Sequence, residues 1–159
     1  MALYAIGDLH LSLGDPGKSM EVFGGAWTDY TEKLRAGFSS LAPEDTVVLC
    51  GDISWGMGLA ASAPDFAFLD ALPGRKLLLK GNHDYWWTTA SKMRRFFAER
   101  GFATLDILHN NSFSCDSMEI CGTRGWFYEE DAAPESAKVF RRELGRLEAS
   151  LAAAGAGEK

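Results

Sequence analysis

The sequence predicts an α/β (α+β) fold, and two observations carry this prediction. Short apolar runs alternate with segments whose apolar residues recur at helical spacing, and a polar turn follows each apolar run. Because strands that alternate with helices form βαβ units, the sheet is expected to be largely parallel. The chain has 159 residues, with no internal repeat and no linker, so it is interpreted as a single domain over residues 1–159.

The first strands share a buried, apolar character and stop at a glycine that a polar residue follows. They are expected at residues 2–6, 46–50 and 76–80. The Gly-, Asp- and Ser-rich segment 11–25, which contains Pro16, is expected to be a loop.

The helices are predicted from apolar residues at helical spacing. They are expected at residues 27–41, 66–72, 87–100 and 134–154. Three short strands are expected between the last two helices, at residues 105–108, 113–115 and 118–121. The turns at Asn110-Asn111 and Asp116-Ser117 favour antiparallel pairing of these strands.

Composition limits the classes of function. The net charge is -6, so a broad, basic nucleic-acid-binding face is not expected. No stretch is long enough to span a membrane, and the N-terminus lacks a signal peptide, so a cytoplasmic protein is expected. The cysteines Cys50, Cys115 and Cys121 match no zinc spacing and are interpreted as reduced, buried thiols.

Polar clusters follow three of the predicted strands, and each cluster begins with a glycine that allows a sharp turn. The polar residues are Asp8, His10, Asp52, Asn82, His83 and Asp84. Since ligands bind outside the carboxyl ends of strands in an open parallel sheet, these clusters are expected to converge in one crevice.

The residue types of these clusters suit a divalent ion such as Mn²⁺, Fe²⁺ or Zn²⁺. Period-two spacing in an extended segment would place Asp8 and His10 on one side, and the carboxylate of Asp52 could bridge two ions. Paired ions lower the pKa of a shared water, and His83 could donate the proton that the leaving group needs. Any one cluster alone is ordinary turn chemistry, so the hypothesis depends on all three occurring together.

The order Asp-x-His, Gly-Asp and Gly-Asn-His-Asp resembles the signature of calcineurin-like metallophosphoesterases, over residues 1 to about 90. The stretches 51–55, 80–87 and 120–126 resemble a bacterial branch of predicted phosphohydrolases. The resemblance implies a β-sandwich flanked by helices and two divalent ions, with Mn²⁺ favoured over Fe or Zn. It also implies roles for the residues: Asp8 and His10 hold the first metal, Asp52 bridges, Asn82 holds the second, His83 protonates the leaving group and Asp84 orients His83.

The sequence also departs from the family pattern. The family supplies three further histidines beyond the region that corresponds to residue 159, two of them in a Gly-His-x-His motif. His109 does not match that motif, and a structural role is expected for it. The chain is therefore expected to be a truncated member with impaired activity, lacking the C-terminal part of the fold. An exposed sheet edge could then lead to a homo-oligomer.

Other residues leave two interpretations open. Trp55, Trp86 and Trp87 could form an apolar wall over a substrate, although ordinary packing is slightly favoured. Arg124 could contact a substrate phosphate, or it could pair with the acids at residues 129–131.

The sequence thus predicts a metal-dependent phosphatase or phosphodiesterase that acts on a phosphorylated small molecule or nucleotide. The alternative is a non-catalytic metal-binding or scaffold protein that retains the fold. A Rossmann-type nucleotide-binding protein is disfavoured, because no Gly-x-Gly-x-x-Gly follows the first strand.

Overall fold

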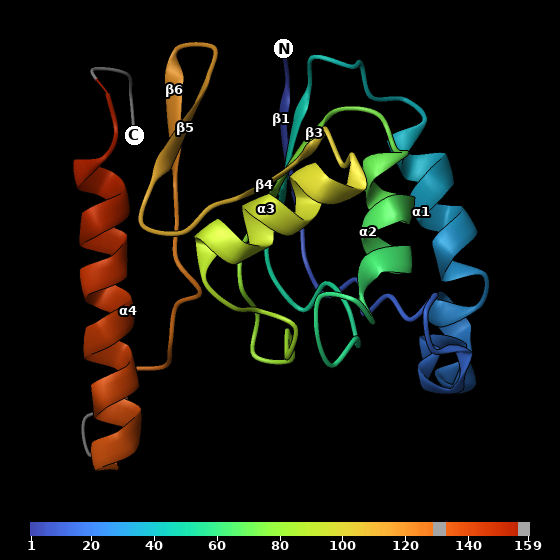
Figure 1. The fold of residues 1–159 in the computed structure, drawn as a ribbon, viewed down its shortest axis with the longest axis horizontal. Helices are drawn as coiled ribbons and strands as arrows, with labels where there is room; N and C mark the ends of the chain where they lie inside the picture. The colour runs from blue at the N-terminus through green and yellow to red at the C-terminus, as the bar shows by residue number, and fades with distance from the viewer. Residues whose placement is uncertain (129–132, 156–159) are drawn as a thin grey trace. The chain divides into compact units, whose positions relative to one another are not determined.

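The computed structural model describes residues 1–128 and 133–155, and the chain divides into two compact units (Figure 1). Unit 1 is Met1–Ile107 and unit 2 is Leu108–Lys159. Each unit is described by itself below, and the assignment of one domain over residues 1–159 stays a prediction.

Unit 1 contains a parallel sheet with the strand order β1-β2-β3-β4. Its strands are β1 (Leu3–Ile6), β2 (Thr46–Leu49), β3 (Arg75–Leu78) and β4 (Leu105–Ile107). Leu3 pairs with Thr46, and Thr46 in turn pairs with Arg75, so the first three strands begin level with one another. Their carboxyl ends therefore lie at one edge of the sheet, as the alternation of strands and helices predicts.

A helix connects each pair of neighbouring strands, and the alternation can be followed in Figure 1 from blue to yellow. These helices are α1 (Tyr30–Phe38), α2 (Ala63–Asp70) and α3 (Ala90–Arg100). The expected loop at 11–25 contains short 3-10 turns: η1 (Pro16–Lys18), η2 (Met20–Phe23) and η3 (Gly25–Trp27). α1 begins later than predicted because Asp29, at its N-terminus, adopts a left-handed conformation with φ 51°.

The core of unit 1 is aromatic and centres on Phe66 of α2. Phe66 is fully buried and lies edge-to-face with Trp86 and Phe97, at ring-centroid distances of 4.8 and 5.2 Å. Burying an aromatic side chain of this size contributes about 1.5–3 kcal/mol. This packing fixes α2 and α3 against the segment that follows β3, which carries the third polar cluster.

The prediction that the first strand is buried is wrong, because all of β1 is exposed, whereas β2 is buried throughout. Among the described strands β1 pairs only with β2, so it forms an edge of the sheet. On the paired side of β1, Thr46 N–H donates to the backbone carbonyl of Ala2, and Cys50 N–H donates to that of Ile6. The alternate residues Leu3 and Ala5 therefore present their backbone groups outward. This fits the expected exposed edge, and self-association through it stays a prediction.

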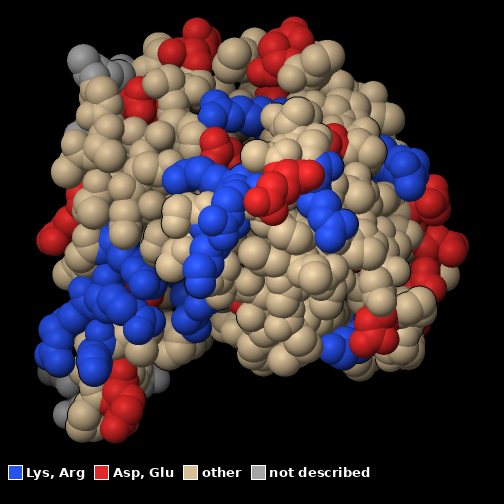
Figure 2. Space-filling view, in the orientation of Figure 1, with Lys and Arg blue, Asp and Glu red and all other residues tan. Residues whose placement is uncertain are grey.

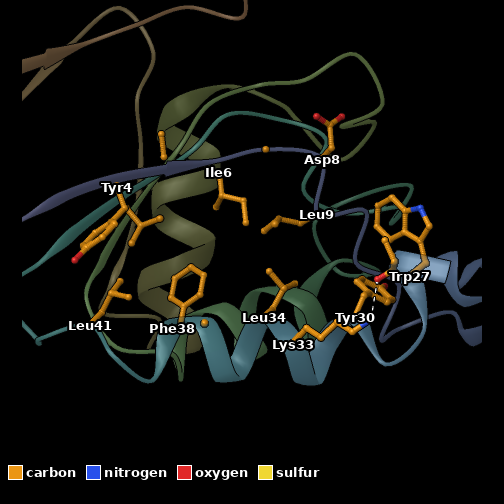
Figure 3. Close-up of a pocket in the computed structure, with 15 residues that line it drawn as sticks. Tyr4, Ile6, Asp8, Leu9, Trp27, Tyr30, Lys33, Leu34, Phe38 and Leu41 are labelled. Atoms are coloured by element: carbon orange, nitrogen blue, oxygen red, sulfur yellow. Dashed lines mark hydrogen bonds between the residues drawn. The ribbon is translucent and has the colours of Figure 1, made fainter.

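An apolar hollow of about 490 Å³, here called the β1–α1 groove, lies between these two elements (Figure 3). Its apolar lining includes Tyr4, Ile6, Leu9, Leu34 and Phe38. Asp8 lies at one end, so the groove begins beside the first polar cluster.

Among its described residues, unit 2 contains an antiparallel hairpin and one helix. The hairpin pairs β5 (Ser112–Cys115) with β6 (Met118–Cys121), and the helix is α4 (Pro134–Ala152). The fully buried Ser150 of α4 donates to the carbonyl of Asn111 and accepts from Gly122 N–H, which ties the helix to both strands at the open end of the hairpin. The antiparallel pairing expected for residues 105–108 is wrong, because α3 returns the chain so that β4 lies parallel to β3.

The surface carries both signs of charge. Lys and Arg side chains on the face in Figure 2 lie among acidic ones. On α3, for example, Arg95 pairs with Glu99, and Arg94 pairs with Asp106 of β4. The described helices include none that is long and apolar enough to cross a bilayer. All three cysteines are free, but only Cys115 is fully buried and Cys50 is exposed, so the expectation of buried thiols is wrong for Cys50.

Lys76 of β3 is fully buried, and its ammonium group binds the turn that joins α2 to β3. Its Nζ donates to the carbonyl oxygens of Leu72 and Gly74. Burial lowers the pKa of Lys76 from 10.5 to about 8, and the nearby charge of Asp70 opposes this shift. Below pH 8 the folded protein must therefore hold a buried charge, which costs stability.

We predict that the stability difference between the wild type and Lys76→Met changes with pH. Between pH 8 and about 10.5 the unfolded chain binds the proton that the folded chain has released, so the wild type gains stability as pH rises. The free energy of unfolding of the wild type, relative to the variant, should increase by about 2 kcal/mol from pH 8 to pH 10. Urea denaturation measures this, with the exposed Lys92→Met as the control. A difference that does not change with pH would contradict the assignment.

Candidate metal centre

The loops that follow β1 and β2 run side by side beyond the sheet. Asp8 N–H donates to the backbone carbonyl of Gly51, His10 N–H to that of Asp52, and Leu11 N–H to that of Ile53, over 2.9–3.0 Å. Leu11 also forms an isolated parallel bridge with Ser54. These bonds continue the β1–β2 ladder past the last strand residues and bring the first two polar clusters together.

Two glycines allow the loop after β3 to approach this pair. A Cβ atom on Gly51 would lie 2.6 Å from the Cα atom of Gly81, and one on Gly81 would lie 2.0 Å from Oδ1 of Asp52. No real side chain fits at such distances. These two glycines therefore permit a close approach between the loops, and the expected approach of the glycine backbone to a bound group stays a prediction.

Three polar residues of the clusters adopt left-handed backbone conformations. Asp8, His10 and Asp52 have φ angles of 56°, 45° and 50°. Asp and His tolerate this region better than most residues, but it still costs free energy relative to an extended backbone. The expectation that Asp8 and His10 lie on one extended segment is therefore wrong. The strand ends at Ile6, and the turned backbone still places Asp8 Oδ1 3.7 Å from His10 Nε2.

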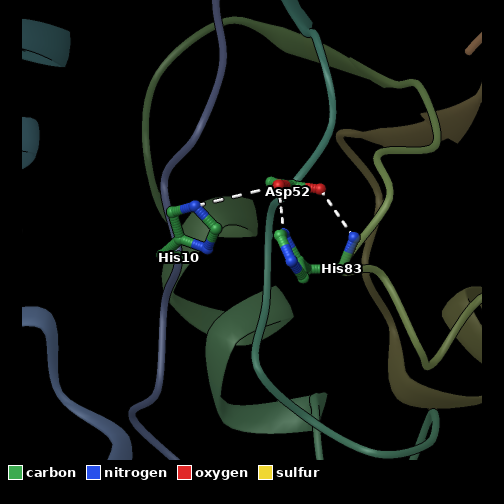
Figure 4. Close-up of side chains that lie close together, drawn as sticks. All are labelled: His10, Asp52 and His83. Atoms are coloured by element: carbon green, nitrogen blue, oxygen red, sulfur yellow. Dashed lines mark hydrogen bonds and ion pairs between the residues drawn. The ribbon is translucent and has the colours of Figure 1, made fainter. Parts of the chain in front are cut away.

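His10, Asp52 and His83 form the centre of the site (Figure 4). Asp52 Oδ2 lies 2.7 Å from His83 Nδ1 and 3.8 Å from His10 Nε2. One ligand atom from each residue lies within 4.8 Å of the others. Small rotations of the side chains would bring these atoms to the distances at which a single divalent ion is bound. Two imidazoles and a carboxylate suit Zn²⁺, Fe²⁺ or Mn²⁺, so the side chains present fit a divalent metal.

The carboxylate of Asp52 interacts with both histidines of the site. Burial raises the pKa of Asp52, but the hydrogen bonds from the backbone N–H and ring of His83, with the charges of His83 and His10, hold that pKa below its usual value. The carboxylate is therefore ionised at neutral pH and available as a ligand.

Asp84 holds the backbone around the site. Its Oδ1 accepts from the N–H groups of Ile53 and Ser54 and from the indole of Trp86, and its Oδ2 accepts from the N–H groups of Asp52 and Gly81. Burial raises the pKa of Asp84, and the hydrogen bonds oppose the rise.

The predicted role of Asp84, to orient His83 through its ring, has no counterpart among the described contacts. The ring of His83 instead bonds Asp52, and His83 joins the candidate ligands themselves. A carboxylate that follows a strand end and binds several backbone N–H groups has no spacing signature, which is why sequence reasoning missed this role.

The remaining predicted residues lie at different distances from the centre. The amide nitrogen of Asn82 lies 3.0 Å from His83 Nδ1, so Asn82 borders the site. Trp55 lies against the histidine rings, while Trp86 is buried in the core and Trp87 packs against that core. The packing interpretation thus fits Trp86 and Trp87, and a wall that Trp55 forms over a substrate stays a prediction.

Arg124 and His109 belong to unit 2. The guanidinium of Arg124 lies over the ring of Trp126, 4.7 Å from its centroid. The acids at 129–131 that were its alternative partners lie outside the described residues, and its contact with a substrate stays a prediction. The backbone N–H of His109 donates to Asn111.

Comparison with known proteins gives one family. The family model described as calcineurin-like phosphoesterase matches residues 1–138. No match was found among the curated proteins. A solved structure, a protein of unknown function from Aquifex aeolicus, is similar at 20% identity, with a TM-score of 0.49, over 89% of this chain and 72% of that one.

Substitution of Asp84 should destabilise unit 1 and loosen the site. In Asp84→Asn the amide group cannot accept from both backbone N–H groups that Oδ2 now binds, so buried donors lose their partner. We expect a loss of about 3 kcal/mol or more in the free energy of unfolding. Urea denaturation measures the loss, and Asp106→Asn, a partly exposed carboxylate, is the control. Stability within about 1 kcal/mol of the wild type would show that Asp84 does not hold the loops.

The left-handed backbone at position 8 should reverse the usual order of stability, in which an alanine variant is more stable than a glycine variant. Since Asp8 is exposed and has a positive φ, Asp8→Gly should be more stable than Asp8→Ala by about 1 kcal/mol. The same pair of substitutions at Glu99, inside α3, should give the opposite order. Thermal or urea denaturation measures both pairs, and equal stability of the two Asp8 variants would argue against the strain.

Proposed function

The chain belongs to the calcineurin-like phosphoesterase family, and on this premise we propose that it is a metal-dependent hydrolase of phosphate esters. The observation that supports this most directly is the convergence of His10, Asp52 and His83, from the ends of three strands, on one small volume. Such a convergence from positions far apart in sequence is costly to build, because it needs close glycine contacts and left-handed residues.

The side chains divide between holding metal and moving a proton. Asp8, His10 and Asp52 would hold one ion, and Asp52 and Asn82 a second; we propose Mn²⁺, with Fe or Zn as the other candidates. Bound ions would polarise the phosphate and lower the pKa of an attacking water.

His83 is the proposed proton donor to the leaving oxygen. Its side chain is 40% exposed, so it can face a substrate while Asp52 fixes its ring through Nδ1. Asp52 accepts from Nδ1–H of this ring, and Nε2, which would carry the donated proton, lies 3.3 Å from the amide nitrogen of Asn82.

The substrate is proposed to be a phosphorylated small molecule or a nucleotide. The net charge of -6 argues against a broad nucleic-acid surface, and the acidic side chains at the centre repel phosphate unless metal is bound. Metal would therefore be needed for substrate binding as well as for chemistry.

One observation favours a second candidate, a non-catalytic metal-binding protein. The compact group of candidate ligands in the described residues contains only three side chains, which suits a single ion better than a pair. Metal counting distinguishes the two candidates, since a catalytic pair requires two ions.

We predict that Asp52→Asn abolishes metal-dependent hydrolysis. Protein loaded with Mn²⁺ and desalted should hold two ions per chain by mass spectrometry and should hydrolyse p-nitrophenyl phosphate or its diester. Asp52→Asn should lose metal and reduce the rate by about 100-fold or more, since even outer partners of metal ligands change activity by up to that factor.

The control is Asp116→Asn, because Asp116 has a similar φ of 57° but lies in the hairpin turn. One ion with no turnover would favour the non-catalytic protein. Turnover that survives Asp52→Asn would remove the proposed site.

A further inference from the structure

The rings of His10 and His83 share one neighbour, Trp55. The Trp55 ring is stacked on His10, with centroids 4.8 Å apart and an interplanar angle of 21°, and it lies tilted against His83 at 5.3 Å and 46°. The two imidazoles are 5.9 Å apart and tilted by 53°. The three rings therefore form one cluster beside the carboxylate of Asp52.

The backbone of Trp55 is fixed independently of these rings. Its N–H donates to the carbonyl of Leu11 over 2.8 Å, and its carbonyl accepts from Lys18. The residue before it, Ser54, is held by the carboxylates of Asp84 and Asp65. Trp55 can thus act as a rigid support against which the histidine rings rest.

The indole N–H of Trp55 points to a role other than stability. It is buried and has no hydrogen-bond partner among the described residues. A buried donor without a partner costs folding free energy, and a phenylalanine at this position would avoid that cost. What the indole supplies is a broad flat face that reaches both imidazoles at once.

We propose that Trp55 is a positioning residue for the metal centre, which sets the ring planes of His10 and His83 before metal binds. Metal ligands bind best when their orientation is already fixed by neighbours, and histidine rings are usually fixed by hydrogen bonds from their second nitrogen. Here an aromatic face contributes that restraint for His10. The inference rests on the proposed function in that His10 is taken as a metal ligand and His83 as the proton donor beside the metal.

Two variants of Trp55 distinguish the effect of the aromatic face from the effect of side-chain bulk. Trp55→Phe keeps a face and removes the unpaired donor, whereas Trp55→Leu keeps apolar bulk and removes the face. In isothermal titration with Mn²⁺, Trp55→Phe should bind within about threefold of the wild type, and Trp55→Leu should bind about tenfold or more weakly. Phe96→Leu is the control, because the ring of Phe96 packs against Phe66 and Phe97 in the aromatic core of unit 1.

Nuclear magnetic resonance of the metal-free protein gives a second readout. The His10 ring protons should be shifted by the ring current of Trp55 in the wild type, retain part of that shift in Trp55→Phe and lose it in Trp55→Leu. A folded Trp55→Leu variant with wild-type Mn²⁺ affinity and unchanged His10 shifts would overturn the inference, as would equal losses of affinity in both Trp55 variants. If the wild type itself binds no Mn²⁺, the proposed function fails, and the ring shifts still decide whether Trp55 orients His10.

Discussion

The buried carboxylate of Asp84 is the interaction on which the geometry of the site depends. It collects backbone N–H groups from the loop after β2 and from the loop after β3, and it binds the indole of a core residue, Trp86. A single carboxyl group thus replaces the strand ladder at the point where the ladder ends. Because water is excluded there, the carboxylate is effective only while all of its partners are in place. The candidate ligands Asp52 and His83 sit on the two loops that it joins.

Much of the fold could be predicted from the sequence because local patterns and tertiary structure agree in unit 1. The apolar runs at β2 and β3 stop at glycines, and α1 and α3 each carry an apolar stripe. The exposure of β1 could not be predicted, since an apolar run looks the same in a central strand and at the edge of a sheet. The pairing of β4 was also beyond local patterns, because the turn residues after it say nothing about which strand lies beside it.

The candidate site was predictable as a set of residues but not as a set of contacts. Spacing identified Asp8, His10, Asp52 and the cluster from Asn82 to Asp84, since polar residues at parallel strand ends must converge. Spacing could not show that Asp84 binds backbone, that His83 bonds Asp52, or that Trp55 stacks on His10. These contacts depend on left-handed turns whose φ angles no periodicity reveals.

The exposure of β1 has a consequence for how the molecule moves. Asp8 and His10 follow an exposed edge strand, so their separation from Asp52 is a local opening that also exposes the buried Leu9 and Leu11. An ion that bridges the two loops would oppose this opening and add its binding free energy to this edge of unit 1. Metal binding at the site and the attachment of β1 to the rest of the sheet are then coupled equilibria. Amide hydrogen exchange along β1 would therefore report metal concentration, whereas exchange in β2 and β3 would report global unfolding.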